Sequence, residues 1–483
     1  MTATATVAGV DVSPGHFVGG RRIFSGRTFP DLSPIDESPL ADVARGGADT
    51  VEAAVEAARQ AFPAWAALGP EGRGEYLFRI ADLIEEREET LAQVETLDNG
   101  SLLEASRLRL MKRAARNFRF FAQLAIDLER RSWEADGTRY EIRRDPSGVA
   151  ALVTPWNAPL MLETWKCGPA LAAGCTAVLK PAEWAPLTAS LLAEIAADAE
   201  LPAGVLNVVQ GIGEEAGAAL VSHPGIARIS FTGSVETAQA IARGAATNLT
   251  PVSFELGGKS PFLVFADADL DRAVETATYQ YDNAGQVCLA GTRLLVAESI
   301  AGEFLDRFLA AVAELRLGDP RDPETDIGPL ITREHLARVE GYVERALGEG
   351  AQLVFGGRVS PELGGLYYEP TLFTHVRQEM EIVQREVFGP VLTLQTFADE
   401  DEAVEFANGT EYGLAATVFT RDEERAERLG GRLVAGTTWV NCFYARDLAA
   451  PFGGAKRSGI GREGGEWSFD FYADVKTVAR RVR

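Results

Sequence analysis

One cysteine of this chain lies in a polar, glycine-flanked segment, an unusual setting for a structural cysteine. Cys288 occurs in YDNAGQVCLAGTR, whereas Cys167 and Cys175 lie in apolar stretches typical of a helix or strand interior. A thiol becomes a nucleophile where polar neighbours stabilise its thiolate. Cys288 is therefore a candidate nucleophile, and the alternative is that it serves as a small buried apolar side chain.

Two further segments carry polar side chains that could assist such a nucleophile. Glu255 ends a predicted strand in FELGGKS, where a carboxylate held against glycines can act as a general base. Asn157 follows a predicted strand in VTPWNAPL, at the edge where open α/β sheets bind ligands, and its amide could donate to an oxyanion. The alternatives are a solvated turn carboxylate for Glu255 and an asparagine turn before a helix for Asn157.

Two strand ends have residue types that suit a dinucleotide. Lys180 and Glu183 follow a strand in VLKPAEW, and a glutamate there can accept hydrogen bonds from a ribose diol. Gly233 and Ser234 in SFTGSVE occupy a strand-to-helix junction, whose unpaired backbone N–H groups favour a pyrophosphate.

A later segment, REVFGPV, completes this set with Glu386 for a second ribose and Phe388 for a nicotinamide face. The GIGEEAG run is one residue out of step with the GxGxxG pattern, and we expect a loop there. The four histidines are scattered without metal-ligand spacing, so we expect neither a metal site nor a Cys–His dyad.

The segments between these residues alternate between strand and helix, as in a doubly wound parallel sheet. After a turn-rich opening, apolar residues recur at helical spacing in residues 51–65, 74–97 and 103–126. Buried strands are then expected at 148–153, 176–179, 205–209 and 228–231, with helices at 165–173 and 188–197. A second series has strands near 262–265, 294–296, 391–397 and 417–419.

Two β-rich segments fall outside both series. Asp136-Gly137 separates two strand-like runs and predicts a hairpin, and residues 467–482 near the C-terminus are also β-rich. Together they predict an arm that pairs strand edges between subunits.

The composition is that of a soluble globular enzyme: 46% of the 483 residues are apolar and 24% are charged. The net charge of −23 repels phosphate backbones and anionic lipids, so we expect no nucleic acid and no membrane partner. Four cysteines form no disulfide framework, and MTATATVAGVDV lacks the pattern of a signal peptide. We therefore expect a cytoplasmic protein with reduced thiols.

Seven of these motifs occur in one order over almost the whole chain: PWNAPL, KPAE, FTGS, ELGGKS, NAGQVC, EVFGP and PFGGAKRSG. In this combination the sequence resembles the aldehyde dehydrogenase superfamily. The resemblance implies an α/β fold that self-associates as a homodimer or homotetramer. It would contain a Rossmann-type NAD-binding domain (1–127 and 146–256), a catalytic domain (257–445) and a small β oligomerisation arm (128–145 and 466–483).

The resemblance also implies roles for individual residues. Cys288 would be the nucleophile that forms a thioester, Glu255 the general base, and Asn157 an oxyanion donor beside the Cys288 N–H. Lys166 and Glu463 match a proton route. Because Glu255 is present, water rather than coenzyme A is the expected acyl acceptor. The residues expected to hold the dinucleotide, NAD rather than NADP because Glu183 repels a 2′-phosphate, are Trp156, Lys180, Glu183, Gly233, Ser234, Leu256, Glu386 and Phe388.

The closer resemblance is to hydroxymuconate-type semialdehyde dehydrogenases of aromatic catabolism. It rests on LETWKCGPALAAGCTAVLKPAEWAPLT and VNCFYARDLAAPFGGAKRSGIGREGGEWSFDFY. Such substrates carry carboxylates, so Arg113 and Arg446 are candidates for a carboxylate clamp, and the alternative for each is a structural salt bridge. Trp165, with Phe443 or Tyr444, would form apolar walls, although such residues are often core packing.

Three other functions remain open at this point. The first is a general aldehyde dehydrogenase for aliphatic or aromatic aldehydes, of the betaine, benzaldehyde or succinate semialdehyde type. The second is a cysteine esterase that needs no cofactor. The third is a non-catalytic binding or structural protein built on this fold, which an intact Cys288, Glu255 and Asn157 set disfavours.

Overall fold

The computed structural model describes residues 4–129 and 131–482. Its central element is an eight-stranded sheet in the order β21-β13-β12-β9-β10-β11-β3-β4. The outer strands are β21 (Gly459–Ile460), β3 (His16–Val18) and β4 (Arg21–Ile23). The five middle strands run parallel and are apolar along most of their length, as expected where both faces of a sheet are covered. They are β9 (Val149–Val153), β10 (Thr176–Lys180), β11 (Leu206–Val208), β12 (Ile226–Gly233) and β13 (Val252–Leu256).

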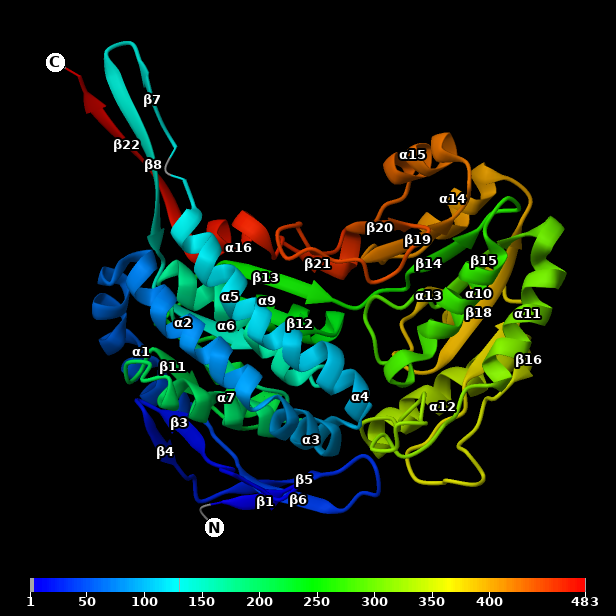
Figure 1. Ribbon diagram of the computed structural model, residues 1–483, viewed down its shortest axis with the longest axis horizontal. Helices are drawn as coiled ribbons and strands as arrows, with labels where there is room; N and C mark the ends of the chain where they lie inside the picture. Colours follow the sequence, from blue (N-terminus) through cyan, green and yellow to red (C-terminus); the bar gives the residue numbers. More distant parts are fainter. Residues whose placement is uncertain (1–3, 130, 483) are drawn as a thin grey trace.

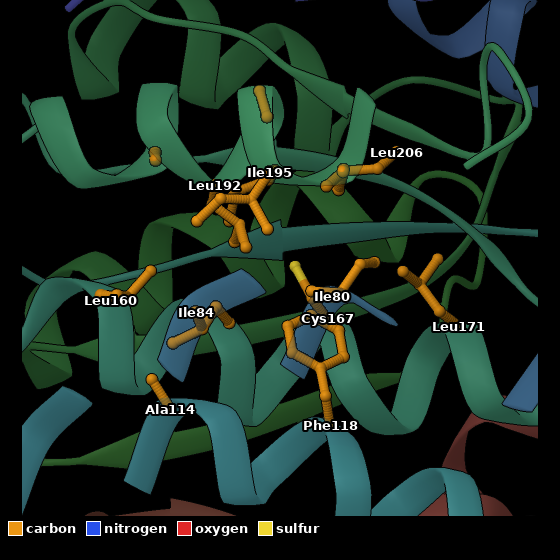
Figure 2. Close-up of a cluster of buried hydrophobic side chains, with 14 of the residues drawn as sticks. Ile80, Ile84, Ala114, Phe118, Leu160, Cys167, Leu171, Leu192, Ile195 and Leu206 are labelled. Atoms are coloured by element: carbon orange, nitrogen blue, oxygen red, sulfur yellow. The ribbon is translucent and has the colours of Figure 1, made fainter. Parts of the chain in front are cut away.

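Helices cover both faces of this sheet (Figure 1). They are α1 (Ala48–Ala67), α2 (Gly69–Glu86), α3 (Glu88–Asn99), α5 (Lys112–Asp127), α6 (Pro159–Ala173), α7 (Leu187–Asp198), α8 (Ala218–Val221) and α9 (Val235–Ala246). Figure 2 shows the Cys167 sulfur among apolar side chains, including Ile80 of α2 and Phe118 of α5. Burial raises the pKa of the Cys167 thiol, so this cysteine is a packing residue, as expected.

A seven-stranded sheet follows, in the order β16-β17-β18-β15-β14-β19-β20. Its strands are β14 (Pro261–Val264), β15 (Arg293–Ala297), β16 (Gln352–Phe355), β17 (Thr371–Thr374), β18 (Val391–Phe397), β19 (Ala415–Phe419) and β20 (Thr437–Val440). The helices that pack on it are α10 (Leu270–Thr278), α11 (Ala301–Ala313), α12 (Arg333–Gly348), α13 (Glu381–Gln384), α14 (Glu400–Asn408) and α15 (Glu423–Arg432). The expected α/β class with two alternating series is confirmed.

A three-stranded sheet, β22-β8-β7, projects away from the rest of the chain (Figure 1). β7 (Ser132–Ala135) and β8 (Thr138–Pro146) form the expected hairpin, and both turn residues, Asp136 and Gly137, have positive φ. β22 (Ala473–Arg481) pairs with β8 along its whole length. The expectation of a strand from residue 467 is wrong, because Gly465–Tyr472 forms helix α16, which packs on α6.

Several local expectations need correction. The opening segment contains short antiparallel strands rather than turns alone: β1 (Ala5–Val7), β2 (Val10–Val12), β3 (His16–Val18), β4 (Arg21–Ile23), β5 (Thr28–Leu32) and β6 (Pro39–Ala44). Helix 74–97 is interrupted at Arg87, where φ is −102°. The helix at 103–126 begins as α4 (Leu103–Ala105) and a π-helix, η1 (Ser106–Met111). GIGEEAG is not a loop, because Gly213–Gly217 forms a π-helical turn, η2.

The predicted ranges 1–127, 128–145 and 466–483 include residues 1–3, 130 and 483, which lie outside the described residues. The domain boundaries stay a prediction. Within the described ranges, no helix is both long and apolar enough to cross a membrane.

Candidate active site

The polar residues singled out in the first series lie at one edge of the eight-stranded sheet. β9, β10, β12 and β13 are parallel neighbours, so their carboxyl ends meet at that edge. The segments that leave there carry Trp156 and Asn157 after β9, Lys180 at the end of β10, Gly233 at the end of β12, and Glu255 near the end of β13. Residues far apart in sequence are thus gathered by topology.

Cys288 follows a strained segment and is only partly buried. In the preceding turn, Asn283 and Ala284 adopt the left-handed conformation with φ of 52° and 55°. The loop also packs tightly on Gly258, where an added Cβ would lie 2.8 Å from the Cys288 carbonyl oxygen. Burial, followed by the charges of Glu386 and Glu255, raises the pKa of the Cys288 thiol to about 12, so the resting sulfur is protonated.

Asn157 is held by the loop that carries the cysteine. Its Nδ2 donates to the Gln286 carbonyl oxygen at 2.9 Å, and its own backbone carbonyl accepts from Asn283 Nδ2 at 3.1 Å. The Gln286 side chain is anchored in turn, because Oε1 accepts from the Ile331 N–H at 3.0 Å. An amide nitrogen carries two hydrogens, so one remains to donate elsewhere.

Glu255 is 5% exposed, and neither of its carboxylate oxygens has a hydrogen-bond partner among the described residues. Burial, and then the charge of Glu463, raise its pKa well above the usual carboxyl range. A raised pKa makes the ionised form of this carboxylate a stronger proton acceptor.

Lys166 and Glu463 lie together in a buried polar network near Glu255. Lys166 Nζ donates to Glu463 Oε1 at 2.9 Å and to Ser230 Oγ at 2.8 Å, and Ser230 Oγ also donates to Glu463 Oε1 at 2.9 Å. The other Glu463 oxygen accepts from Trp165 Nε1 at 2.6 Å. The two residues expected on a proton route are therefore directly paired.

Arg113 and Arg446 lie over the same Trp165 ring, with guanidinium carbons 5.4 Å and 4.6 Å from its centroid. Arg113 donates through Nε to Asn117 at 2.9 Å. Among the described residues, Nη2 of Arg113 and both Nε and Nη2 of Arg446 are buried without an acceptor. Burial, and then the charge of Arg446, lower the pKa of Arg113 to about 9. A bound anion would accept hydrogen bonds from these nitrogens and would stabilise the charged form of Arg113.

Phe443 and Tyr444 form an aromatic cluster beside Cys288. Their ring centroids are 4.3 Å apart, and both rings contact Tyr279, at 6.2 Å and 5.7 Å. Tyr444 has a positive φ of 58°, so its backbone is constrained by the loop.

The segment around Ser234 has the features of an anion site. Ser234 caps α9, and its Oγ accepts from the Thr237 N–H at 3.1 Å, which leaves other first-turn N–H groups unpaired by the cap. A cavity of about 240 Å³ adjoins it, and its charged lining combines three arginines with three glutamates: Arg338, Arg385, Arg457, Glu236, Glu381 and Glu386. The helix N-terminus is the feature of this cavity that suits a pyrophosphate.

Glu386 lies at the same cavity and accepts from the Gly258 N–H at 3.0 Å. Burial raises its pKa to about 7. A side chain at Gly257 would overlap this carboxylate, so a larger residue there would require the Glu386 side chain to move. Leu256, the last residue of β13, is buried in the adjoining core.

Lys180 and Glu183 are paired at the end of β10. Lys180 Nζ donates to the Pro181 carbonyl at 2.8 Å and to Glu183 Oε2 at 3.4 Å. Trp156 is edge-on to Phe388, with ring centroids 5.4 Å apart.

Sequence reasoning missed Gln286, Asn283 and His335, although the first two lie within the NAGQVC motif. No group of metal-ligating side chains occurs within residues 4–129 and 131–482.

Comparison with known proteins identifies the family. The model of the aldehyde dehydrogenase family matches residues 24–478, and the chain belongs to this family. A 2-hydroxymuconic semialdehyde dehydrogenase from Pseudomonas sp. (strain CF600) is 44% identical, over 97% of this chain and 99% of the relative. A 2-aminomuconic semialdehyde dehydrogenase from Danio rerio is 41% identical, over 96% and 97%.

Solved structures agree with this assignment. HpcC from Thermus thermophilus superposes with a TM-score of 0.95 at 46% identity, covering 100% of this chain and 98% of that one. Betaine aldehyde dehydrogenase from Staphylococcus aureus, crystallised with NAD⁺, has a TM-score of 0.95 at 38% identity, covering 98% and 96%. The resemblance read from the seven motifs is thereby confirmed.

Proposed function

We propose that this enzyme oxidises a carboxylated semialdehyde to the acid, with NAD as the oxidant and Cys288 as the nucleophile. The observation that carries the substrate class is the pair of guanidinium groups over Trp165, three of whose nitrogens are buried without an acceptor among the described residues. A hydroxymuconate semialdehyde, the type of substrate named for the Pseudomonas relative, carries the anionic group that this pair requires.

The residues at the Ser234 cavity fit a dinucleotide, because a capped helix N-terminus offers N–H donors for a pyrophosphate and the Glu386 carboxylate offers acceptors for a ribose diol. When bound, NAD accepts the hydride that the aldehyde carbon gives up. Trp156, Lys180, Glu183, Gly233, Ser234, Leu256, Glu386 and Phe388 would hold it. Glu183 would repel a 2′-phosphate, so NADP is the less favourable coenzyme.

The first chemical step belongs to Cys288 and Asn157. The sulfur gives up its proton to solvent and forms a bond to the aldehyde carbon, and the carbonyl electrons move onto oxygen. The second hydrogen of Asn157 Nδ2 and the Cys288 N–H donate to that oxygen. Because Gln286 already holds the first hydrogen of Nδ2, the amide plane needs no reorganisation during the reaction.

Glu255 performs the second step. Once the acyl group is a thioester on Cys288, Glu255 accepts a proton from water as the water oxygen attacks the acyl carbon and the C–S bond breaks. The raised pKa of Glu255 makes it a competent proton acceptor whose charge is neutralised afterwards. Glu463 and Lys166, paired nearby, would carry that proton away from the site.

The charge of the pocket separates this substrate class from the family alternatives. Betaine aldehyde carries a quaternary ammonium group, which would meet two like charges at Arg113 and Arg446. A neutral aliphatic or aromatic aldehyde would contact the walls formed by Trp165, Phe443 and Tyr444 but would leave both guanidinium groups unpaired. Of these substrates, only a carboxylated semialdehyde can both contact the apolar walls and pair with the two guanidinium groups.

The test compares kcat/KM for 2-hydroxymuconate semialdehyde and for benzaldehyde in wild type, Arg113→Ala and Arg446→Ala. Losing a charge-assisted hydrogen bond should lower the ratio by about tenfold to a hundredfold. The matched control is Arg116→Ala, because Arg116 is exposed and follows Arg113 by three residues in α5. An unchanged ratio would show that Arg113 and Arg446 do not bind the substrate carboxylate. Ester cleavage without NADH formation from any aldehyde would favour the cysteine esterase.

We also propose that the projecting sheet mediates self-association as a homodimer or homotetramer. β22 is an edge strand with mostly exposed residues, and such edges invite pairing with another chain. Sedimentation of the enzyme truncated after Tyr472 should show smaller particles than the full chain.

A further inference from the structure

A buried histidine contacts the segment that carries the expected coenzyme residues. His335 is 5% exposed, and its Nε2 lies 2.7 Å from the Phe388 carbonyl oxygen. A carbonyl only accepts hydrogen bonds, so Nε2 must carry the hydrogen and donate it. His335 itself is fixed at the start of α12, where the Thr332 side chain accepts from its backbone N–H at 3.1 Å.

The carbonyl that His335 holds belongs to a strained residue. Phe388 has a φ of 61°, which is unfavourable for a bulky side chain and persists only where its surroundings enforce it. One turn further along α12, Arg338 Nη2 donates to the Glu386 carbonyl at 3.2 Å. The same face of α12 thus holds the backbone at both Glu386 and Phe388.

The histidine ring also completes an aromatic cluster with Trp156 and Phe388. Ring centroids are 5.4 Å apart for Trp156 and His335, 5.4 Å for Trp156 and Phe388, and 6.2 Å for His335 and Phe388. All three pairs are edge-to-face, with interplanar angles of 66°, 86° and 70°. The orientation of the Phe388 ring therefore depends on both a hydrogen bond and ring contacts from His335.

We propose that His335 is a positioning residue for the coenzyme, which acts by holding the Phe388 carbonyl and so orienting the Phe388 ring. This inference rests on the proposed role of Phe388 at the nicotinamide. Burial lowers the pKa of His335 to about 4, so the ring stays neutral and keeps one donor at working pH.

The test measures NAD⁺ binding by calorimetry without aldehyde, in His335→Gln, His335→Asn and His335→Leu. Glutamine places its amide nitrogen at the reach of Nε2, asparagine falls one methylene short, and leucine has no donor. Asn and Leu should raise the Kd for NAD⁺ by about tenfold, the worth of one good hydrogen bond, while Gln stays within about threefold. KM for the aldehyde should stay unchanged.

The matched control is His375→Asn, at an exposed histidine in the same half of the chain, which should bind NAD⁺ like wild type. Equal Kd values in wild type, Asn and Leu would overturn the inference, as would an equal loss in all three variants, because packing volume would then be the cause. If the Leu variant does not fold, the Gln and Asn pair decides. Failure of wild type to bind NAD⁺ would instead overturn the proposed coenzyme.

Discussion

The Nδ2 of Asn157 donates to the Gln286 carbonyl oxygen, two residues before Cys288, at 2.9 Å. The proposed oxyanion donor and the proposed nucleophile are thus fixed to one another by a single short segment. Asn157→Ala should lower kcat by about 10² to 10³, the usual effect of losing one such donor. Steady-state kinetics would check this, and alkylation of Cys288 should be unaffected. A kcat close to wild type would exclude Asn157 from the oxyanion site.

Glu255→Gln separates the two chemical steps. Because acylation precedes attack by water, the variant should release about one NADH per active site in a rapid burst and then turn over at least about 100-fold more slowly. Stopped-flow absorbance at the NADH band measures both phases. If the burst disappears as well, Glu255 also takes the proton from Cys288.

Cys288 should react slowly with alkylating agents near neutral pH. Its pKa of about 12 means that the thiolate fraction, and hence the rate of iodoacetamide modification, should rise about tenfold per pH unit between pH 7 and 10. Cys288→Ala provides the background from Cys442 and should form no NADH at any pH. A rate that levels off below pH 9 would contradict the raised pKa.

Glu183 should govern the choice between coenzymes. Replacing it with glutamine removes the charge that repels a 2′-phosphate, so the kcat/KM ratio of NADP to NAD should rise about tenfold or more. Glu214→Gln, an exposed neighbour, is the control for a general change in surface charge. An unchanged ratio in both variants would place the discrimination elsewhere.

A buried carboxyl pair should make stability depend on pH. Glu95 accepts from the Leu160 N–H at 3.0 Å, and burial raises its pKa from 4.5 to about 7. Burial, and then the charge of Glu95, also raise the pKa of Glu163, which lies beside Glu95. A raised folded-state pKa means that stability is complete below pH 4.5 and is lost as the pH rises through 7, by about 3 kcal/mol for Glu95.

Glu95→Gln keeps the acceptor for Leu160 but cannot ionise, so the fall in Tm between pH 5 and pH 8 should be smaller than in wild type. Calorimetric scans at both pH values measure it, with the exposed Glu86→Gln as control. The same fall in wild type and in Glu95→Gln would show that the pKa of this carboxyl is not raised in the folded state.

Local sequence signals predicted the strand ends and the residues that follow them, because parallel strands place those residues at one edge. The N-cap at Ser234 and the hairpin at Asp136-Gly137 follow from the same local chemistry. The contact between His335 and Phe388 could not be predicted in this way. It joins residues 53 positions apart, and a histidine on the buried face of a helix gives no signal of its partner.

The segment from residue 467 shows how tertiary packing overrides residue type. Trp467, Phe469, Phe471 and Tyr472 favour a strand by composition, yet they form α16. Phe469 and Tyr472 are buried there, next to α6, and the chain becomes extended only at Ala473. Packing against a neighbouring helix, which the local pattern does not contain, determines this element.

Trp165 contacts three charged groups at once: Glu463 through its indole N–H, and Arg113 and Arg446 through its ring. A substitution of Trp165 would disturb the proposed proton route and the proposed anion pocket together, so this position could not be adjusted for one purpose alone. Phe443 and Tyr444 are proposed only as walls of the substrate pocket. We therefore expect descendants of this enzyme that acquire new substrates to change at Phe443 and Tyr444 and to keep Trp165.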